Sequence, residues 1–359
     1  MSTNVKSASC RSCLLVALVA GAACGGGVLP GGPDSSVTPE PRDATADTAP
    51  GSADAALPDA PSDAPSDVEG DSSLLDTSVA DASVADTSPP SRCGPHPLRV
   101  LAGNLSSGAT QTYDPGDGIR ILRALAPDVA LIQEFKYQGN SAAAQRAFVD
   151  AAFGSGYSFV RGTARNNSDI PNGVVSRFPI VDSGEWIDPG VTNRTFVWAR
   201  IDVPGPEDLW AISVHLLTTN SADRAAEAAV LVGLVGALPA GALVVLGGDL
   251  NTNTRTEAAI TTLQAAFVTS GPYPADQAGN SNTNAPRNRA YDWVLASPEL
   301  EPCNVPTTLG MVSLPSGLVF DTRVFTPLTD APPALVGDSA AASMQHMAVV
   351  RDFSLADPL

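Results

Sequence analysis

An apolar run that ends in an acid constrains this chain more than any other feature. Residues 242–251 read Ala-Leu-Val-Val-Leu-Gly-Gly-Asp-Leu-Asn. A short β-branched run bounded by glycine predicts a buried strand, and the alternation of side chains places Asp249 and Asn251 on one side at its end. A buried Asp is costly unless it meets a metal, a cation or a proton to handle. A turn that caps a following helix through Asn253 or Thr254 is the alternative.

The first 24 residues have the pattern of a secretory signal peptide. They contain two basic residues and no acid, followed by an apolar stretch over 13–23 that is too short to span a membrane. Residues 20–24, Ala-Gly-Ala-Ala-Cys, resemble a bacterial lipoprotein signal, in which Cys24 would be lipidated. Ordinary cleavage within the Ala-rich run is the alternative. We therefore expect export, as an outer-membrane or cell-surface lipoprotein or an extracellular protein, with any membrane attachment through the lipid alone.

Residues 25–92 have the composition of a disordered acidic linker. They contain 13 Asp or Glu, 10 Pro and no Phe, Trp, Tyr or Ile, so they cannot bury enough apolar surface to offset the entropy of ordering. Every aromatic residue lies in 93–359, which is long enough for one large core. This sequence predicts a single folded domain over 93–359.

The cysteines fit an oxidising compartment. Cys10 and Cys13 would leave with the signal and Cys24 would carry lipid, so Cys93 and Cys303 remain in the folded part. These two are candidates for one disulfide that fastens the start of the domain, and two free thiols are the alternative.

Strands outnumber helices in the folded part. We expect strands at 98–102, 128–132, 157–161, 173–176, 196–203, 209–214, 291–296 and 347–353 and in the run before Asp249, and helices at 118–126, 141–152, 222–238 (with Ser221 as N-cap) and 255–267. Because the helices fall between pairs of strands, the pattern favours two packed sheets with helices outside.

Polar side chains recur where these apolar strands end. They are Asn104, Glu134, His215, Asp249, Asn251, Asp292 and His346. One such residue is explained by a turn, but strand ends that share an edge of a sheet core converge in space. Two of the chain's three histidines belong to this set, which therefore predicts a site.

Several of these segments resemble the endonuclease/exonuclease/phosphatase superfamily, which includes the DNase I-like nucleases. Gly248-Asp-Leu-Asn251 resembles its Gly-Asp-x-Asn motif, Gln133-Glu134 its Gln-Glu, Val214-His-Leu216 its Thr-His-Leu, and 172–180 its Ser-Arg-aromatic-Pro strand. The resemblance covers 98–353. It implies an α/β fold, a four-layer α/β/β/α sandwich, and metal-dependent phosphoester hydrolysis.

The resemblance also implies a metal site. Glu134 would hold a divalent cation, Mg²⁺ with Mn²⁺ as the alternative, because a hard oxygen ligand suits a hard ion. Asn104 would lie beside it. Asp292 would orient a histidine or complete the metal shell.

The remaining strand-end residues would act on the substrate. By the same resemblance, Asp249 would activate the attacking water and Asn251 would position the phosphate. His346 would stabilise charge on the phosphoryl oxygens, and His215 would bind phosphate or assist the leaving group. Positioning and charge neutralisation dominate phosphoryl transfer, so no Ser or Cys nucleophile is required.

One position departs from the superfamily pattern. Gln345 precedes His346, where the superfamily carries Asp. An Asp fixes the imidazole tautomer and favours its cation, whereas Gln can do only the first. Either Asp338 or Asp292 takes its place, or the enzyme is slow, or it is inactive.

The substrate is the least constrained part of the function. A nuclease is expected to carry a basic track, yet 93–359 is net acidic and Lys136 is its only lysine. We expect Asn172, Arg194 and Arg289 to contact substrate, and 276–289 to be a substrate-facing segment or an ordinary mobile loop. DNA or RNA is favoured weakly over a phospholipid or phosphomonoester as the substrate. We expect the protein to be a monomer. The alternative from a different functional class is a surface binding module with weak catalytic activity.

Overall fold

The computed structural model describes residues 91–107, 116–205 and 207–357. The expected signal peptide, the lipidation site at Cys24 and nearly all of the expected linker lie outside these ranges.

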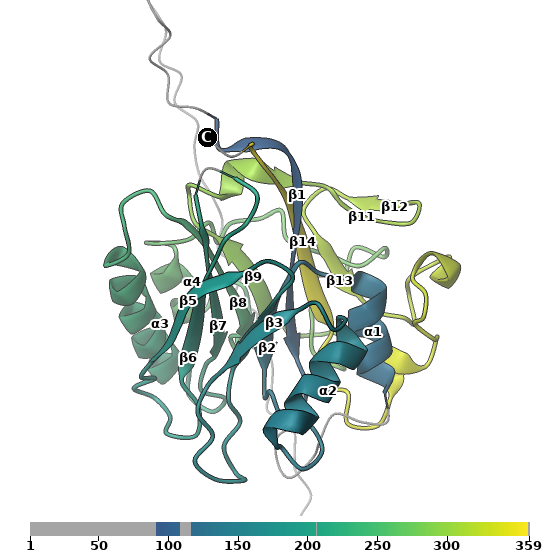
Figure 1. Cartoon of the computed structure of the whole chain (residues 1–359), viewed down its shortest axis with the longest axis horizontal. Helices are drawn as coiled ribbons and strands as arrows, with labels where there is room; N and C mark the ends of the chain where they lie inside the picture. Colours follow the sequence, from purple (N-terminus) through teal and green to yellow (C-terminus); the bar gives the residue numbers. More distant parts are fainter. Residues whose placement is uncertain (1–90, 108–115, 206, 358–359) are drawn as a thin grey trace, which may run out of the picture. The chain divides into compact units, whose positions relative to one another are not determined.

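A first sheet carries both ends of the folded part (Figure 1). Its strands run in the order β10 (Asn304–Val305), β14 (Ala348–Leu355), β1 (Cys93–Asn104), β2 (Val129–Gln133), β4 (Gly173–Ser176) and β3 (Ser158–Arg161), and β13 (Leu318–Phe320) also pairs with β14. β1 and β2 are parallel, with Asn104 opposite Gln133. This register brings Asn104 and the start of the loop that carries Glu134 to the same edge.

A second sheet has the order β5 (Ile180–Trp186), β6 (Phe196–Ile201), β7 (Leu209–His215), β8 (Leu243–Asp249) and β9 (Asp292–Ala296). β7 and β8 are parallel with His215 opposite Asp249, and β9 runs antiparallel with Asp292 opposite Asp249. Three polar residues therefore lie side by side on adjacent strands.

The two sheets pack face to face, and helices cover their outer faces. Apolar side chains of both sheets share one core, to which Val100 and Leu131 contribute from the first and Ala199 and Val245 from the second. Figure 1 shows α1 (Asp117–Leu125) and α2 (Ala142–Ala152) on one side and α3 (Ser221–Gly236) and α4 (Ala258–Leu263) on the other. The predicted α/β/β/α sandwich is confirmed.

Two glycines allow the sheets to approach closely at the end of β8. A Cβ on Gly247 would lie 2.7 Å from Leu131 Cδ1 of the other sheet. Gly248 has a φ of +141°, and a Cβ there would lie 2.0 Å from the carbonyl oxygen of Val214. Only glycine fits this backbone, so the Gly-Gly pair before Asp249 is a packing requirement of the strand that carries the acid.

Short elements complete the fold. They are the hairpin β11 (Thr307–Leu309) and β12 (Val312–Leu314) and the 3₁₀ turns η1 (Glu301–Cys303), η2 (Leu328–Asp330) and η3 (Asp338–Ala340). Cys93 and Cys303 form a disulfide with a Cα–Cα distance of 5.0 Å. This bond ties the first residue of β1 to η1.

Some elements differ from expectation, in their bounds or in being present at all. The cap of α3 is Asn220, whose side chain accepts from the amides of Ala222 and Asp223, rather than Ser221. α4 covers only 258–263 of the expected 255–267. β5 was not expected because it is an edge strand whose side chains are mostly outside the core, so its apolar signal is weak.

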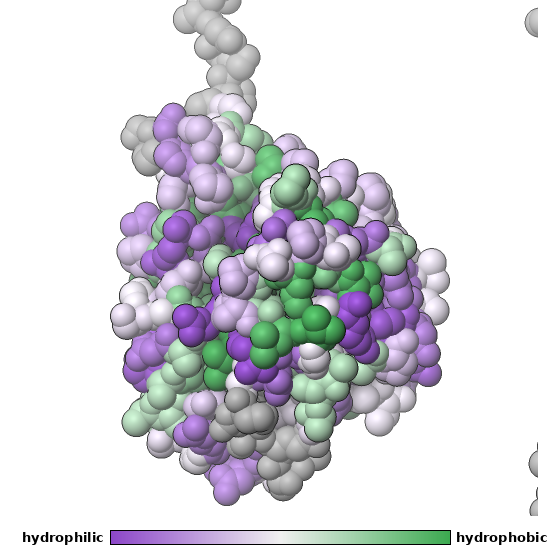
Figure 2. Space-filling view, turned by 90° about the vertical axis from the view of Figure 1, so that its right-hand side faces the viewer, coloured by the Kyte–Doolittle hydropathy of each residue, from purple (hydrophilic) through white to green (hydrophobic). Residues whose placement is uncertain are grey.

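The described surface carries few large apolar side chains. Those that are exposed are Val181, Ile187, Val230, Met311, Leu335 and Val336. On the face in Figure 2, apolar residues gather near the middle and polar ones surround them. All six are aliphatic or Met, and no helix among the described residues is long and apolar enough to cross a membrane.

Candidate active site

Asp249 is the centre of a buried polar cluster at the common edge of the two sheets. Its Oδ2 accepts a hydrogen bond of 3.0 Å from Asn104 Nδ2 and lies 3.3 Å from His215 Nε2 and 3.7 Å from His346 Nε2. Its Oδ1 accepts from the amide of Asn251 at 2.9 Å. The strand-end residues therefore converge as expected. Asp249 also does not cap α4, which begins nine residues later with Glu257 as its N-cap.

His346 is held by a second acid and by the chain beside it. Its Nδ1 lies 3.0 Å from Asp292 Oδ2. The backbone of His346 forms a β-bridge with Asn284, and the amide of Met347 donates to the carbonyl of Thr283 at 2.7 Å. Thr283 Oγ1 also accepts from the amide of Asp292. The loop before β9 thus fixes both members of the His346–Asp292 pair.

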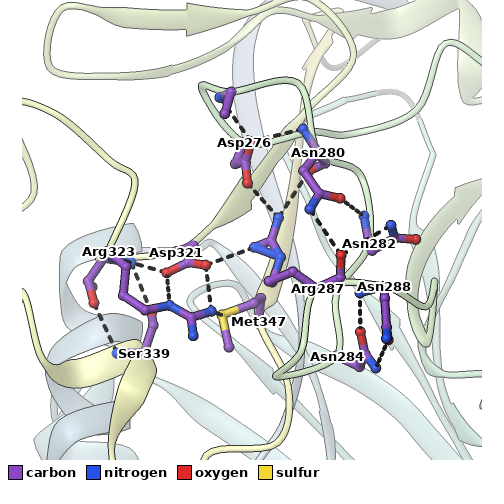
Figure 3. Close-up of polar contacts among 12 residues, drawn as sticks. Asp276, Asn280, Asn282, Asn284, Arg287, Asn288, Asp321, Arg323, Ser339 and Met347 are labelled. Carbon is purple, nitrogen blue, oxygen red and sulfur yellow. Dashed lines mark hydrogen bonds and ion pairs between the residues drawn. The ribbon is translucent and has the colours of Figure 1, made fainter.

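That loop is internally cross-linked (Figure 3). Arg287 donates to Asp276 at 2.6 Å and to Asp321 at 3.1 Å, and Asn284 accepts from the amides of Asn288 and Arg289. These bonds give 276–289 a defined conformation, in which Thr283 and Asn284 contact the chain on both sides of His346.

Three residues of the site region have left-handed backbones. Ser106, Glu134 and Asn251 have φ values of 54°, 52° and 51°. This conformation is costly for residues other than glycine, and it concentrates where a structure holds functional groups in place. Each of these residues lies just after a strand, where the turn directs polar groups toward the shared edge.

Burial and neighbouring charges separate the two histidines. Burial raises the pKa of Asp249 to about 7, with Asp292 and Glu134 adding to the rise and the His346 cation opposing it. Burial alone would lower the pKa of His346, but Asp292 and Asp249 raise it to about 9. Burial, Arg194 and His346 hold the pKa of His215 well below its ordinary value. Near neutral pH, His346 is therefore charged and His215 is neutral.

The donor set fits a hard divalent cation. Ligand atoms of Asp249, Asp292 and His346 lie within 4.8 Å of one another, and the Asn104 amide lies 3.4 Å from Glu134 Oε1. Carboxylate and amide oxygens are the ligands that Mg²⁺ prefers. Burial is the main cause of the raised pKa of Asp249, and Asp292 and Glu134, whose charge a cation would neutralise, raise it further. Because metal ligands must be unprotonated, the charged His346 is the least suited of these groups.

The three residues expected to contact substrate differ in their burial and in their partners. Asn172 is buried, and its amide donates to the carbonyl of Thr195 at 2.7 Å. Arg194 is also buried, and it donates to the carbonyls of His215 and Leu216. Arg289 is exposed and contacts the side chain of Asn253, two residues beyond Asn251. Of the three, Arg289 is the one on the surface beside the cluster.

The geometry distinguishes the two acids considered as substitutes for the missing Asp. Asp292 contacts His346 directly. Asp338 instead pairs with Arg120 at 2.5 Å. The side chain of Gln345 is exposed, while its backbone bonds to Ser106 Oγ and to the amide of Ala285.

Sequence reasoning missed three residues that hold the site. Thr283 carries no motif, and its role depends on a loop that folds back on β9. Asp188 and Glu227 are buried, and Glu227 accepts from the amide of Leu217, two residues after His215. Charged residues at helical spacing in an Ala-rich helix, as at Arg224 and Glu227, were the available signal.

The comparisons with known proteins agree with this fold. A model of the Endonuclease/Exonuclease/phosphatase family matches residues 119–311. The chain belongs to this family. Its members are hydrolytic phosphoesterases that commonly depend on divalent metal ions. No curated protein matches the sequence.

Solved structures share the fold at low sequence identity. An endonuclease/exonuclease/phosphatase from Beutenbergia cavernae is 19% identical, with 72% of each chain covered and a TM-score of 0.50. D. rerio TDP2 in complex with a single-strand DNA product is 16% identical, with 72% of this chain and 99% of that chain covered and a TM-score of 0.49. Sphingomyelinase C from Streptomyces griseocarneus is 17% identical, with coverage of 72% and 99% and a TM-score of 0.47. At these identities the likeness concerns the fold alone.

Proposed function

We propose that this family member is an exported, metal-dependent phosphodiester hydrolase of the nuclease type. The observation that carries the proposal is the meeting of Asp249 with the charged His346–Asp292 pair at the edge where both sheets end. Hydrolysis of a phosphoester needs a base that takes a proton from water and a positive charge that stabilises the phosphoryl oxygens. In this cluster the carboxylate of Asp249 and the imidazolium of His346 would supply them.

Each side chain has a distinct part in the proposed reaction. Asp249 takes a proton from the attacking water, which its pKa of about 7 suits. His346, with Nδ1 held by Asp292, donates through Nε2 to a phosphoryl oxygen and stabilises the charge that builds there. The neutral His215 contacts the phosphate or the leaving group, and Asn251 orients the phosphate.

Glu134 and Asn104, together with the nearby carboxylate of Asp292, would hold Mg²⁺ or Mn²⁺. The cation would neutralise negative charge on the phosphate. All of these groups already lie together in the described chain, so the cation would find its ligands close to their final positions.

DNA or RNA is the substrate that we favour weakly. Arg289 is exposed beside Asn253 and offers one cationic contact at the rim of the site. The one lysine of the folded part, Lys136, is buried and donates to the carbonyl of Asn167. Because basic surface is scarce, a phospholipid or phosphomonoester is the alternative within the family.

A substrate panel tests the proposal. The purified chain would be assayed with Mg²⁺ or Mn²⁺ against DNA, RNA, a generic phosphodiester, a phosphomonoester and sphingomyelin. We expect EDTA to abolish hydrolysis and Asp249→Asn to lower it at least about 1,000-fold. Asp182→Asn, a change of the same chemistry at an exposed residue of β5, should leave it unchanged. Equal rates for wild type and Asp249→Asn on every substrate would refute the proposal.

A catalytically weak binding module is the second candidate, and Gln345 favours it. Gln345→Asp restores the residue that the superfamily resemblance calls for. If Asp292 already supports His346, this change should alter the turnover number less than about threefold. A gain of about 10-fold or more would show that the natural chain is a weak enzyme.

Export and lipid attachment are proposed from the sequence of residues 1–24. Metabolic labelling with a radioactive fatty acid should mark the wild-type chain and not Cys24→Ser. A wild-type chain without label, found in the medium, would favour ordinary cleavage. We also propose that the protein acts as a monomer, which light scattering of the purified chain can test.

A further inference from the structure

Two buried acids face each other near His215. Asp188 follows β5 and is 3% exposed, and Glu227 lies on α3 and is 0% exposed. Asp188 Oδ1 accepts from the amide of Gly190 at 2.8 Å, and Glu227 Oε2 accepts from the amide of Leu217 at 2.9 Å. Asp188 Oδ2 and Glu227 Oε1 are buried and accept from no donor among the described residues.

The surroundings of the two carboxyl groups disfavour a second negative charge. Burial raises the pKa of both, and Asp188 adds to the rise at Glu227, whose pKa is about 8. Two adjacent buried carboxylates cannot both be ionised, so one acid keeps its proton. A Cβ on Gly190 would lie 2.3 Å from Glu227 Oε1, which shows how closely the backbone packs on the pair.

Arg194 balances the one remaining negative charge. Among the acids that attract this 5% exposed guanidinium, Asp188 has the largest effect, followed by Asp249, Glu227 and Glu134. Its Nε donates to the carbonyl of His215 at 2.5 Å and its Nη2 to that of Leu216 at 2.9 Å. The cation therefore interacts with the charges of both the acid pair and the active site, and it holds the backbone that carries His215.

Three successive residues at the end of β7, 215–217, are held by side chains. Besides the bonds from Arg194, the side-chain Nδ2 of Asn251 donates to the carbonyl of Leu216, and Glu227 Oε2 accepts from the amide of Leu217. The ring of His215 lacks such support on one side, because its buried Nδ1 has no partner among the residues that the structure describes. The orientation of this ring thus depends on its backbone more than that of His346, which Asp292 fixes directly.

We propose that Arg194, together with the buried acids Asp188 and Glu227, positions His215 against Asp249. The inference rests on the proposed hydrolysis and assigns Arg194 to positioning instead of the substrate contact expected from the sequence. All three are positioning residues that act through the backbone of 215–217.

A set of substitutions in the full chain tests the charge balance. Glu227→Gln imitates the protonated acid, and Asp188→Asn allows Glu227 to take the negative charge, so each should lower the turnover number less than about threefold. The double variant removes both acids of the pair and leaves the buried Arg194 with only the active-site carboxylates, Asp249 and Glu134, to offset its charge. We expect it to lose at least about 10-fold, more than the product of the single effects. If the loss of turnover in the double variant equals the product of the two single losses, the proposal is overturned.

Arg194→Lys tests the action on His215. Lysine keeps the charge but loses the fork that spans two carbonyls. We expect turnover to fall about 10- to 100-fold with little change in KM, and no further loss when Arg194→Lys is added to His215→Ala. Arg200→Lys, at a partly exposed position of β6 where Arg200 pairs with Asp208, is the matched control and should have no effect. Full additivity of Arg194→Lys with His215→Ala would overturn the proposal.

An NMR measurement separates this inference from the proposed function. The ¹⁵N shifts of the His215 ring should change in Arg194→Lys and in the double variant but not in Arg200→Lys. This readout needs no activity. If the wild type hydrolyses nothing, the proposed function fails while the shifts still decide the positioning role. Unchanged His215 shifts in folded Arg194→Lys and in the folded double variant would refute it.

Discussion

Asp292 Oδ2 lies 3.0 Å from Nδ1 of His346, although 54 residues separate them. Asp292 is the first residue of β9 in the second sheet, and His346 comes just before β14 of the first. The contact therefore joins the two sheets at the site. It also raises the pKa of His346 and leaves its Nε2 directed toward Asp249.

Asp292→Asn should remove the charge that sustains the His346 cation. We expect the turnover number to fall about 10- to 100-fold, as for the loss of other groups that orient a catalytic residue. The pKa of His346, followed by NMR, should fall from about 9 toward its ordinary value. An unaltered pKa together with an unaltered rate would contradict the role of Asp292.

Asp338→Asn is the matched control for Asp292→Asn, because it makes the same change at the other acid considered as a partner of His346. Asp338 is buried against Arg120, on the far side of the first sheet from the second. Breaking this ion pair leaves a partly buried guanidinium without its partner, so thermal stability should drop while turnover changes less than about twofold. A loss of turnover as large as that of Asp292→Asn would mean that Asp338 supports His346 in some other way.

Gly248→Ala should destabilise the fold strongly. The new Cβ would approach the carbonyl oxygen of Val214 to 2.0 Å and Gln133 Nε2 to 2.6 Å, and the φ of +141° strains any other residue. We expect a loss of roughly 3 kcal/mol or more in the free energy of unfolding, measured with urea. Gly139→Ala, where nothing lies within 4 Å, should change it by less than about 0.5 kcal/mol.

Removal of the disulfide should lower stability without touching the site. The bond between Cys93 and Cys303 closes a loop across 210 positions of the chain. Cys93→Ser with Cys303→Ser should cost about 2 to 5 kcal/mol. Dithiothreitol should lower the melting temperature of the wild type but not of this variant. Equal sensitivity of both would show that the bond contributes little.

Stability should depend on pH through Glu227. Its pKa of about 8 in the folded chain is above the ordinary value of 4.5, so the folded state binds the proton more tightly. Glu227 therefore makes its full contribution to the free energy of unfolding below about pH 4.5, and this contribution is lost as the pH rises toward 8. Glu227→Gln has no such proton to lose. As the pH rises from 5 to 9, the free energy of unfolding of the variant should therefore increase relative to that of the wild type by roughly 1 to 3 kcal/mol. Asp182→Asn, at an exposed site, should show no such trend.

Much of the site could be predicted from the sequence because local pattern determines it. An apolar run that stops at a polar residue fixes a strand end wherever it occurs, and His215, Asp249 and Asp292 proved to be opposite one another on three adjacent strands. The Gly-Gly before Asp249 likewise marked a backbone that no larger residue could adopt. These are properties of single segments, and periodicity and motif suffice to recognise them.

Only the tertiary structure decided which groups touch. Asp338 and Asp292 were equal candidates to support His346, and the packing of η3 on α1 directs Asp338 to Arg120 instead. Arg194 was expected at the substrate, but the fold buries it against the carbonyls after β7 and places two acids near it. The sequence by itself determined which residues stand at strand ends. Which of them keep a proton, hold a ring or carry a charge depends on burial and on contacts between distant segments, which no local pattern encodes.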